Sequence, residues 1–221
     1  MRKSLSLLYA SALLLAGCQT DSYEAGQGRY SLMQTDLADV AVDGDKKAVS
    51  FTTDDGDQYT FTSAATAQWI QTADTTYRAV VYYNKVASGQ AEALGLSAVP
   101  TVIPKESWRF KETRQDPVGV ESIWLSRSRK YVNMGLLFMS GYVDDVLGRH
   151  AISVAQDTIL VNADQTRTAY YRFLHDQGDT PQHFTSRHYV SILLPQQLPD
   201  TVCLSIVTHS GTVSRRLALR Q

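Results

Sequence analysis

The sequence has only two cysteines, no surplus of basic residues and no apolar run long enough to cross a bilayer. Its longest apolar stretch, residues 5–15, is well short of the roughly 20 residues that a spanning helix needs. The formal net charge is -1, so there is no cationic excess to neutralise phosphates and nucleic acid is not expected as a partner. These absences exclude a disulfide framework, a helical membrane domain and a typical nucleic-acid binder.

Catalytic and cofactor motifs are also missing. The chain has no GxSxG elbow, no SxxK, no HExxH, no paired CxxC and no glycine-rich phosphate cradle. We therefore expect no cofactor, no metal and no catalytic residue that a motif would reveal. A triad assembled from distant residues stays open as an alternative.

The first 18 residues have the pattern of a bacterial lipoprotein signal. Arg2 and Lys3 precede the apolar run, and Leu15-Ala16-Gly17-Cys18 resembles a lipobox. We expect cleavage before Cys18 and acylation of its thiol. Two or more acyl chains anchor a protein stably, at about 0.8 kcal/mol for each buried methylene. The cleaved chain keeps 19 basic and 22 acidic groups, a net charge of about -3.

These features place the protein in the cell envelope. Gln19, rather than an aspartate, follows the cysteine, which favours the outer membrane by analogy with enterobacterial sorting. The periplasmic and the exposed face both stay open. We expect lipid on Cys18 to be the membrane contact and Cys203, in the apolar stretch TVCLSIV, to be an inert buried thiol.

The remainder of the sequence predicts an all-β protein. Short runs rich in β-branched and aromatic residues alternate with turns that contain Gly, Asp, Asn or Pro, at a spacing typical of antiparallel sandwiches. The expected strands cover residues 37–42, 48–51, 58–62, 77–86, 121–125, 130–139, 150–154, 169–174, 188–194, 201–207 and 212–219. Residues 99–103 are at best an edge strand, because Pro100 and Pro104 interrupt them. Only residues 64–71 suggest a helical turn.

A charged stretch at residues 105–116 suggests a domain boundary. We predict a signal peptide over residues 1–17, the lipidated cysteine and a flexible tether over 18–29, a first β domain over 30–112 and a β-sandwich over 113–221. Asp54-Asp55-Gly56-Asp57 is interpreted as a hairpin turn, because it lacks the ligand spacing of a calcium loop.

Two groups of side chains are candidates for chemistry or binding. His175, His183 and His188 lie within 14 residues, and they are weak candidates for a metal site or for the site of a hydrolase, since their spacing fits no known metal motif. Tyr82, Tyr83, Trp108 and Tyr171 are candidate ligand-facing aromatics. Neighbours on a strand face opposite ways, so one of Tyr82 and Tyr83 must leave the core, and the same holds for Tyr170 and Tyr171.

The second half resembles a known family. The matching features are Asp116-Pro117-Val118, residues 120–124, Tyr131-Val132-Asn133-Met134, residues 150–154, Leu174-His175-Asp176, Gly178-Asp179-Thr180 and Tyr189-Val190-Ser191. In this order, and with the lipobox, they resemble the NigD-like lipoproteins of Bacteroidetes. Residues 126–130 depart from the pattern, because they are more basic than the turn before Tyr131 in that family.

The resemblance implies an N-terminal OB-like barrel and a C-terminal β-sandwich. The family is named after a bacteriocin-associated gene cluster and supplies no catalytic or binding residues to carry over. Together with the missing motifs, it favours a lipid-anchored, non-enzymatic module that binds an envelope protein or a glycan, with an immunity role as a narrower version. An envelope hydrolase with a site near His175, His183 and His188 is the alternative.

Overall fold

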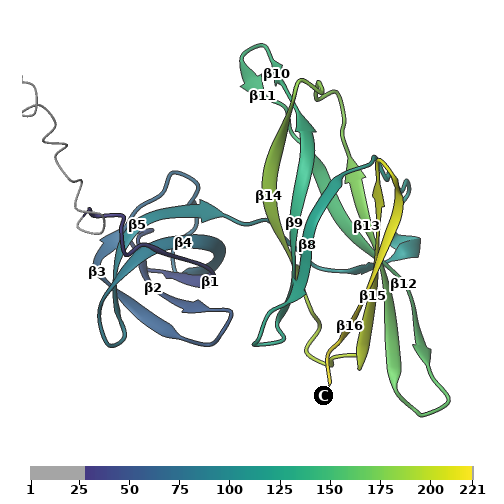
Figure 1. The fold of residues 1–221 in the computed structure, drawn as a ribbon, viewed down its shortest axis with the longest axis horizontal. Helices are drawn as coiled ribbons and strands as arrows, with labels where there is room; N and C mark the ends of the chain where they lie inside the picture. The colour runs from purple at the N-terminus through teal and green to yellow at the C-terminus, as the bar shows by residue number, and fades with distance from the viewer. Residues whose placement is uncertain (1–27, 221) are drawn as a thin grey trace, which may run out of the picture. The chain divides into compact units, whose positions relative to one another are not determined.

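A computed structural model describes residues 28–220 of the chain. The expected signal peptide and Cys18 lie outside the described residues. Strands dominate the described part (Figure 1), which confirms the all-β prediction. Its only helix is the 3₁₀ turn η1 (Ser107–Arg109), and no helix in residues 28–220 has the length and apolarity to cross a membrane. Residues 34–221 form one compact unit.

The first five strands close into a barrel. They are β1 (Gln34–Val42), β2 (Ala48–Thr53), β3 (Gln58–Ala65), β4 (Thr75–Ala87) and β5 (Gln90–Ala98). Their order around the barrel is β1-β2-β3-β5-β4, with β5 parallel to β3 and antiparallel to β4. Closure leaves no open sheet edge. The OB-like kinship of this barrel stays a prediction of the resemblance.

Alternate residues of the barrel strands fill its interior. In β1, Ala38, Val40 and Val42 are buried at a spacing of two, as a strand with one inward face requires. Aromatic rings occupy the centre, where Phe51 lies 5.1 Å from Tyr59 and 4.9 Å from Tyr83 between ring centroids. Such close aromatic packing contributes beyond the buried area alone.

Nine of the remaining strands build two larger sheets. They are β6 (Thr101–Val102), β7 (Lys105–Glu106), β8 (Gly119–Leu125), β9 (Tyr131–Ser140), β12 (Ala151–Val161), β13 (Arg167–Asp176), β14 (Phe184–Leu193), β15 (Thr201–Thr208) and β16 (Gly211–Ala218). One sheet has the order β16-β15-β13-β12-β7 and the other β6-β14-β9-β8. Buried side chains from both sheets form one shared core, which makes this part a β-sandwich.

Strand β9 is buried on both faces. Val132, Met134 and Leu136 point into the sandwich core, and the alternate positions Tyr131 and Asn133 are also buried. Tyr131 and Asn133 form hydrogen bonds to Asp39 and Asp54 of the first half of the chain. The hydrophobic run at residues 131–139 therefore reflects contacts on two sides.

The structure differs from the sequence predictions in three places. Strand β5 was not predicted, because QAEALGLSA has the composition of a helix rather than of a strand. Residues 64–71 form no helix; β3 continues to Ala65 and a turn follows. The short strands β6 and β7 precede residue 113, yet they pair with β14 and β12 of the sandwich. Strand β6 is an edge strand, as the flanking prolines predict.

Candidate functional site

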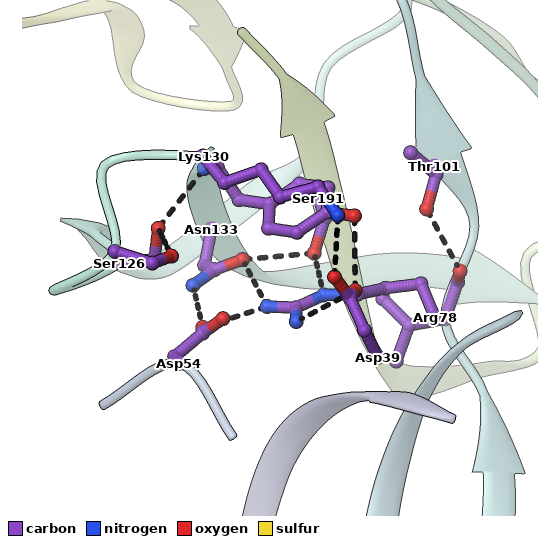
Figure 2. Close-up of polar contacts among 11 residues, drawn as sticks. Asp39, Asp54, Arg78, Thr101, Ser126, Lys130, Asn133 and Ser191 are labelled. Carbon is purple, nitrogen blue, oxygen red and sulfur yellow. Dashed lines mark hydrogen bonds and ion pairs between the residues drawn. The ribbon is translucent and has the colours of Figure 1, made fainter. Parts of the chain in front are cut away.

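A buried arginine joins side chains from both halves of the chain (Figure 2). The guanidinium of Arg78 donates to Asp54 Oδ2 at 2.6 Å, to Asn133 Oδ1 at 3.2 Å and to Ser191 Oγ at 3.2 Å. It also lies 3.4 Å from Asp39, and its side chain is only 3% exposed. A buried cation needs paired acceptors, and Arg78 has them on every side.

The acceptors around Arg78 are themselves satisfied. Asn133 Nδ2 donates to Asp54 at 2.7 Å, and Ser191 Oγ donates to Asn133 Oδ1 at 2.8 Å. Asp39 accepts from Lys130 at 2.6 Å and from Tyr131 at 2.9 Å. Because each of these acceptors already has a hydrogen-bond donor within the protein, we interpret the network as a structural joint rather than as a ligand site.

A recess beside this joint contains aromatic and acidic side chains. Its volume is about 300 Å³, and Asp36, Asp55, Trp124 and Tyr189 are among its lining residues. The Trp124 and Tyr189 rings meet edge to face at 6.2 Å. Aromatic rings beside carboxylates can hold a sugar or a cationic group. Asp36, however, already accepts from Tyr83 at 2.8 Å.

The aromatic residues singled out from sequence lie in four different settings. Tyr83 and Tyr171 are 1% and 2% exposed and belong to the two cores, so neither can face a ligand. Tyr82 is half-buried. Trp108 is 74% exposed, and Arg109 covers its ring at 4.8 Å. Strand alternation decides the first three positions, and the sequence did not show which member of each tyrosine pair faced inward.

The structure brings together a different histidine trio from the one expected. His150 joins His175 and His188, whereas His183 is exposed and lies outside the cluster. The rings of the three clustered histidines stack on Phe138, with centroids 4.9 to 5.1 Å away. His150 was missed because 25 residues separate it from His175, and only the antiparallel pairing of β12 with β13 brings the two together.

Hydrogen bonds link these residues into one line, which we call the histidine–serine chain. His175 Nδ1 lies 3.0 Å from the main-chain oxygen of Asp116, and His175 Nε2 lies 2.9 Å from His150 Nδ1. His150 Nε2 is 3.4 Å from Ser140 Oγ, which is 2.5 Å from Ser186 Oγ. Ser186 Oγ is 2.8 Å from His188 Nε2. Six groups from five segments of the chain thus take part.

Burial disfavours the charged form of two histidines in the histidine–serine chain. Desolvation lowers the pKa of His150 below its ordinary value, and nearby His175 and His188 lower it further. Desolvation also lowers the pKa of His188. These two imidazoles therefore favour the neutral form more than a solvent-exposed histidine does.

Ser140, His150 and His175 are linked in the order found in catalytic triads, in which a nucleophile is bonded to a base and the base to an orienting residue. Ser140 is only 2% exposed, however, and it lines none of the recesses described in residues 28–220. The geometry thus favours a structural or proton-binding role over attack on a substrate. Within the same residues, no three His, Cys, Asp or Glu side chains are placed to hold a metal ion.

An exposed apolar hairpin follows Ser140 of the histidine–serine chain. Strands β10 (Tyr142–Val143) and β11 (Val146–Leu147) pair only with each other among the described strands, and Figure 1 shows them beyond the ends of β9 and β14. Tyr142, Val143, Val146 and Leu147 are 57, 46, 63 and 45% exposed. We call residues 142–147 the apolar hairpin. Phe184 lies beside it, with its ring 5.8 Å from that of Tyr142.

The apolar hairpin has a tight tip and a fixed base. Asp144 and Asp145 at the tip both have positive φ, 49° and 62°, as a two-residue turn of the type favoured in hairpins requires. At the base, Gly148 N donates to Gly141 O at 2.9 Å. A Cβ on Gly141 would lie 2.6 Å from the carbonyl oxygen of Pro181, and one on Gly148 would collide with Thr180. Only glycine fits at either position.

Comparisons with known proteins find solved structures of similar fold. No protein-family model matches the chain, and no curated protein shows significant sequence similarity. A NigD-like immunity protein from Bacteroides caccae matches with a TM-score of 0.63 at 20% identity, over 84% of this chain and 96% of that one. A protein from Parabacteroides distasonis described as toxin-related matches with a TM-score of 0.63 at 20% identity, over 84% and 92%.

A protein from Bacteroides fragilis described as a lipoprotein matches with a TM-score of 0.59 at 12% identity, over 84% of this chain and 96% of that one. Identities this low establish the fold alone. The chain therefore has the fold of a NigD-like immunity protein, in agreement with the resemblance to NigD-like lipoproteins that its sequence carries.

Proposed function

We propose that this protein is a non-enzymatic, lipid-anchored envelope protein that binds a partner protein through the apolar hairpin. The observation that carries the proposal is the exposure of four large apolar side chains on six consecutive residues. Contiguous exposed apolar surface is uncommon on soluble proteins and marks interaction sites. The glycines at the base fix the hairpin's direction, which lowers the conformational cost of docking.

The charge of the hairpin favours a protein over a lipid bilayer as its occupant. Asp144 and Asp145 occupy the tip and form no hydrogen bond or ion pair with the described residues. A tip that led the hairpin into hydrocarbon would bury both carboxylates, at a cost of about 3 kcal/mol each. A protein groove with an apolar floor and basic residues at one end would accept both parts of the hairpin.

A narrower version of the proposal is bacteriocin immunity. It is supported by the resemblance of the sequence to NigD-like lipoproteins and by the name of the Bacteroides caccae neighbour. In this version, the partner is a toxin or a toxin receptor in the outer membrane. Deletion should then sensitise a producing strain to its own toxin, and unchanged survival would remove the immunity role.

Site-specific photocrosslinking in cells tests the docking surface. A photoreactive phenylalanine at Val146 should yield one discrete protein adduct, and the same group at Val161 should not. Val161 is a matched control, because it is 64% exposed and Val146 is 63% exposed. Asp144→Asn with Asp145→Asn should reduce the adduct formed from Val146.

Several results would contradict the proposal. Equal adducts from both positions would mean that exposure alone drives crosslinking. A product of twice the chain's own mass would identify self-association, and lipid adducts would identify the bilayer as the occupant. The absence of any adduct from Val146 would end the proposal.

A glycan ligand is the second candidate, and the recess lined by Trp124 and Tyr189 favours it. Trp124→Ala should abolish binding on a glycan array if this recess is the site. Trp108→Ala serves as the control, because Trp108 is exposed and lines none of the recesses described in residues 28–220. An array without signal for the unmodified protein would exclude this candidate.

The membrane anchor is proposed from the lipobox. Cys18→Ser should abolish the incorporation of labelled fatty acid and shift the protein from the membrane to the soluble fraction. We propose that the anchored protein resides in the outer membrane, because Gln19 follows the cysteine. Unchanged fractionation of the variant would overturn the anchor.

A further inference from the structure

The histidine–serine chain starts at a main-chain carbonyl oxygen, which can only accept a hydrogen bond. The main-chain oxygen of Asp116 lies 3.0 Å from His175 Nδ1, so this nitrogen must carry a hydrogen. In a neutral His175, Nε2 is then an acceptor, and His150 Nδ1–H donates to it across 2.9 Å. His150 Nε2 is left to accept from the Ser140 hydroxyl at 3.4 Å. Each ring therefore has one defined neutral tautomer.

One added proton fits this geometry. When His175 becomes the cation, its Nε2–H donates to His150 Nδ1, and His150 Nε2–H donates to Ser140 Oγ. Two contacts reverse direction while the heavy atoms stay in place. With a second proton, His150 Nδ1 and His175 Nε2 both become donors, and two positive rings face each other with centroids 5.1 Å apart. That contact must break.

The groups around the pair do little to stabilise a second charge. Asp176 is paired with Arg114 at 3.4 Å, and the carboxylate of Asp116 accepts from the amide of Gln177 at 2.7 Å. On β14, Arg187 is paired with Glu121, and His188 would add positive charge of its own.

The other groups near His150 and His175 are a cation, uncharged side chains and carboxylates that are not bonded to either ring. Arg149 precedes His150 and adds positive charge, and β9 contributes only Phe138 and Ser140. The carboxylates of the hairpin tip, Asp144 and Asp145, form no bond to either ring of the pair. No carboxylate in the described part of the chain is hydrogen-bonded to His150 or His175.

The pair lies at the base of the apolar hairpin. Ser140 directly precedes Gly141, and His150 follows Gly148 by two residues, so the Ser140–His150 contact bridges the two arms of the hairpin. Loss of the His150–His175 contact removes the hydrogen bond that ties this arm to β13. The hairpin would then keep its backbone bonds, its packing against residues 180–181, the hydrogen bond from Thr180 Oγ1 to Arg149 O and the ring contact between Tyr142 and Phe184.

We infer that His150 and His175 form an acid-sensitive clasp, which takes up one proton without rearrangement and opens the base of the apolar hairpin when it takes up a second. Acidification would thus disorder the surface that meets the partner. The effect on partner binding rests on the proposed function, whereas the response of His150 and His175 to acid does not depend on a partner.

Amide hydrogen exchange of the mature acylated chain in detergent tests the clasp. Between about pH 8 and about pH 4, a range that spans histidine titration, exchange at Val143 and Val146 should rise roughly tenfold after correction for the intrinsic rate. His183→Gln should keep this response, because His183 lies outside the cluster. His150→Gln should remove it.

A hairpin whose corrected exchange is independent of pH would overturn the inference, as would loss of the response in His183→Gln. If His150→Gln does not fold, nitrogen NMR of the imidazoles in the unmodified protein decides. His150 and His175 should then take up two protons in two successive steps, each of which the resonances of both rings report; one independent step for each ring would refute the clasp. Crosslinking from Val146 at pH 8 does not depend on the pair, so failure of either proposal can be recognised separately.

Discussion

Arg78 is the centre of the polar network drawn in Figure 2, because its guanidinium contacts polar side chains from four strands or turns. Its guanidinium bonds to Asp54, Asn133 and Ser191 and lies over the ring of Tyr131 at 4.1 Å. Because Asp54 is 17% exposed, removal of the cation leaves a poorly solvated carboxylate without its partner.

Arg78→Met should therefore lower the free energy of unfolding by about 3–5 kcal/mol, the cost of breaking a buried pair from one side. Lys130→Gln, which removes a half-exposed partner of Asp39, should cost less than about 1 kcal/mol. Urea denaturation measures both. Combining Asp54→Leu with Arg78→Met should recover part of the loss, since no charge is then left unpaired. Equal effects of the two single variants would contradict this account.

The depressed pKa values of His150 and His188 predict acid-dependent stability. In the unfolded chain both rings titrate near the ordinary value of about 6.5, so below that pH the unfolded state binds more protons than the folded one. The free energy of unfolding should be at its full value above about pH 6.5 and should fall as the pH drops toward the folded pKa values. Urea midpoints at a series of pH values measure this, and His188→Asn should flatten the curve. A midpoint that rises on acidification would be the wrong sign.

At the scale of elements, the glycines at the base of the apolar hairpin give a sharp steric prediction. Gly148→Ala places a methyl group against Thr180 and should displace the hairpin, with a loss of about 1–3 kcal/mol. Gly44→Ala is the control, because the nearest atoms to its added Cβ belong to the Asp74 side chain at 3.7 Å. Thermal denaturation and amide exchange at Val146 measure the difference, and equal tolerance of both substitutions would show that the base can adjust.

Most strands could be predicted from sequence because local chemistry determines them. The turn at Gly56, with φ of 93°, and the hairpin that ends at Gly211, with φ of 118°, both have the conformation that their glycines favour. The alternation of Ala38, Val40 and Val42 likewise follows from one buried face. Strand β5 escaped prediction because its pairing with β3 and β4, rather than its composition, makes it a strand.

The candidate sites were much less predictable. His150 and His175 meet through strand pairing across 25 residues, and no local pattern signals such a contact. In the apolar hairpin, adjacent aspartates mark the turn at its tip, where Asp144 and Asp145 have positive φ. Its exposed apolar arms cannot be distinguished in sequence from core residues, because apolar residues in short strands are usually buried.

At the scale of the whole molecule, the joint around Arg78 predicts that the barrel and the sandwich unfold together. Residues 34–221 form one compact unit, and the shared bonds reach β1, β4, β9 and β14. Urea unfolding should show one transition by both tryptophan fluorescence and circular dichroism. Two transitions in the unmodified protein would show that the joint contributes little.

Strand β9 has a mechanical consequence as well. Asn133, near its start, is bonded to Arg78, and Ser140, its last residue, stands at the base of the hairpin. Seven steps of a strand span roughly 23 Å, and pairing with β8 and β14 on either side stiffens this length. A partner bound to the hairpin would therefore be kept at a fixed distance from the barrel. A force applied to that partner would be transmitted along β9 to the hydrogen bond between Asn133 and Arg78.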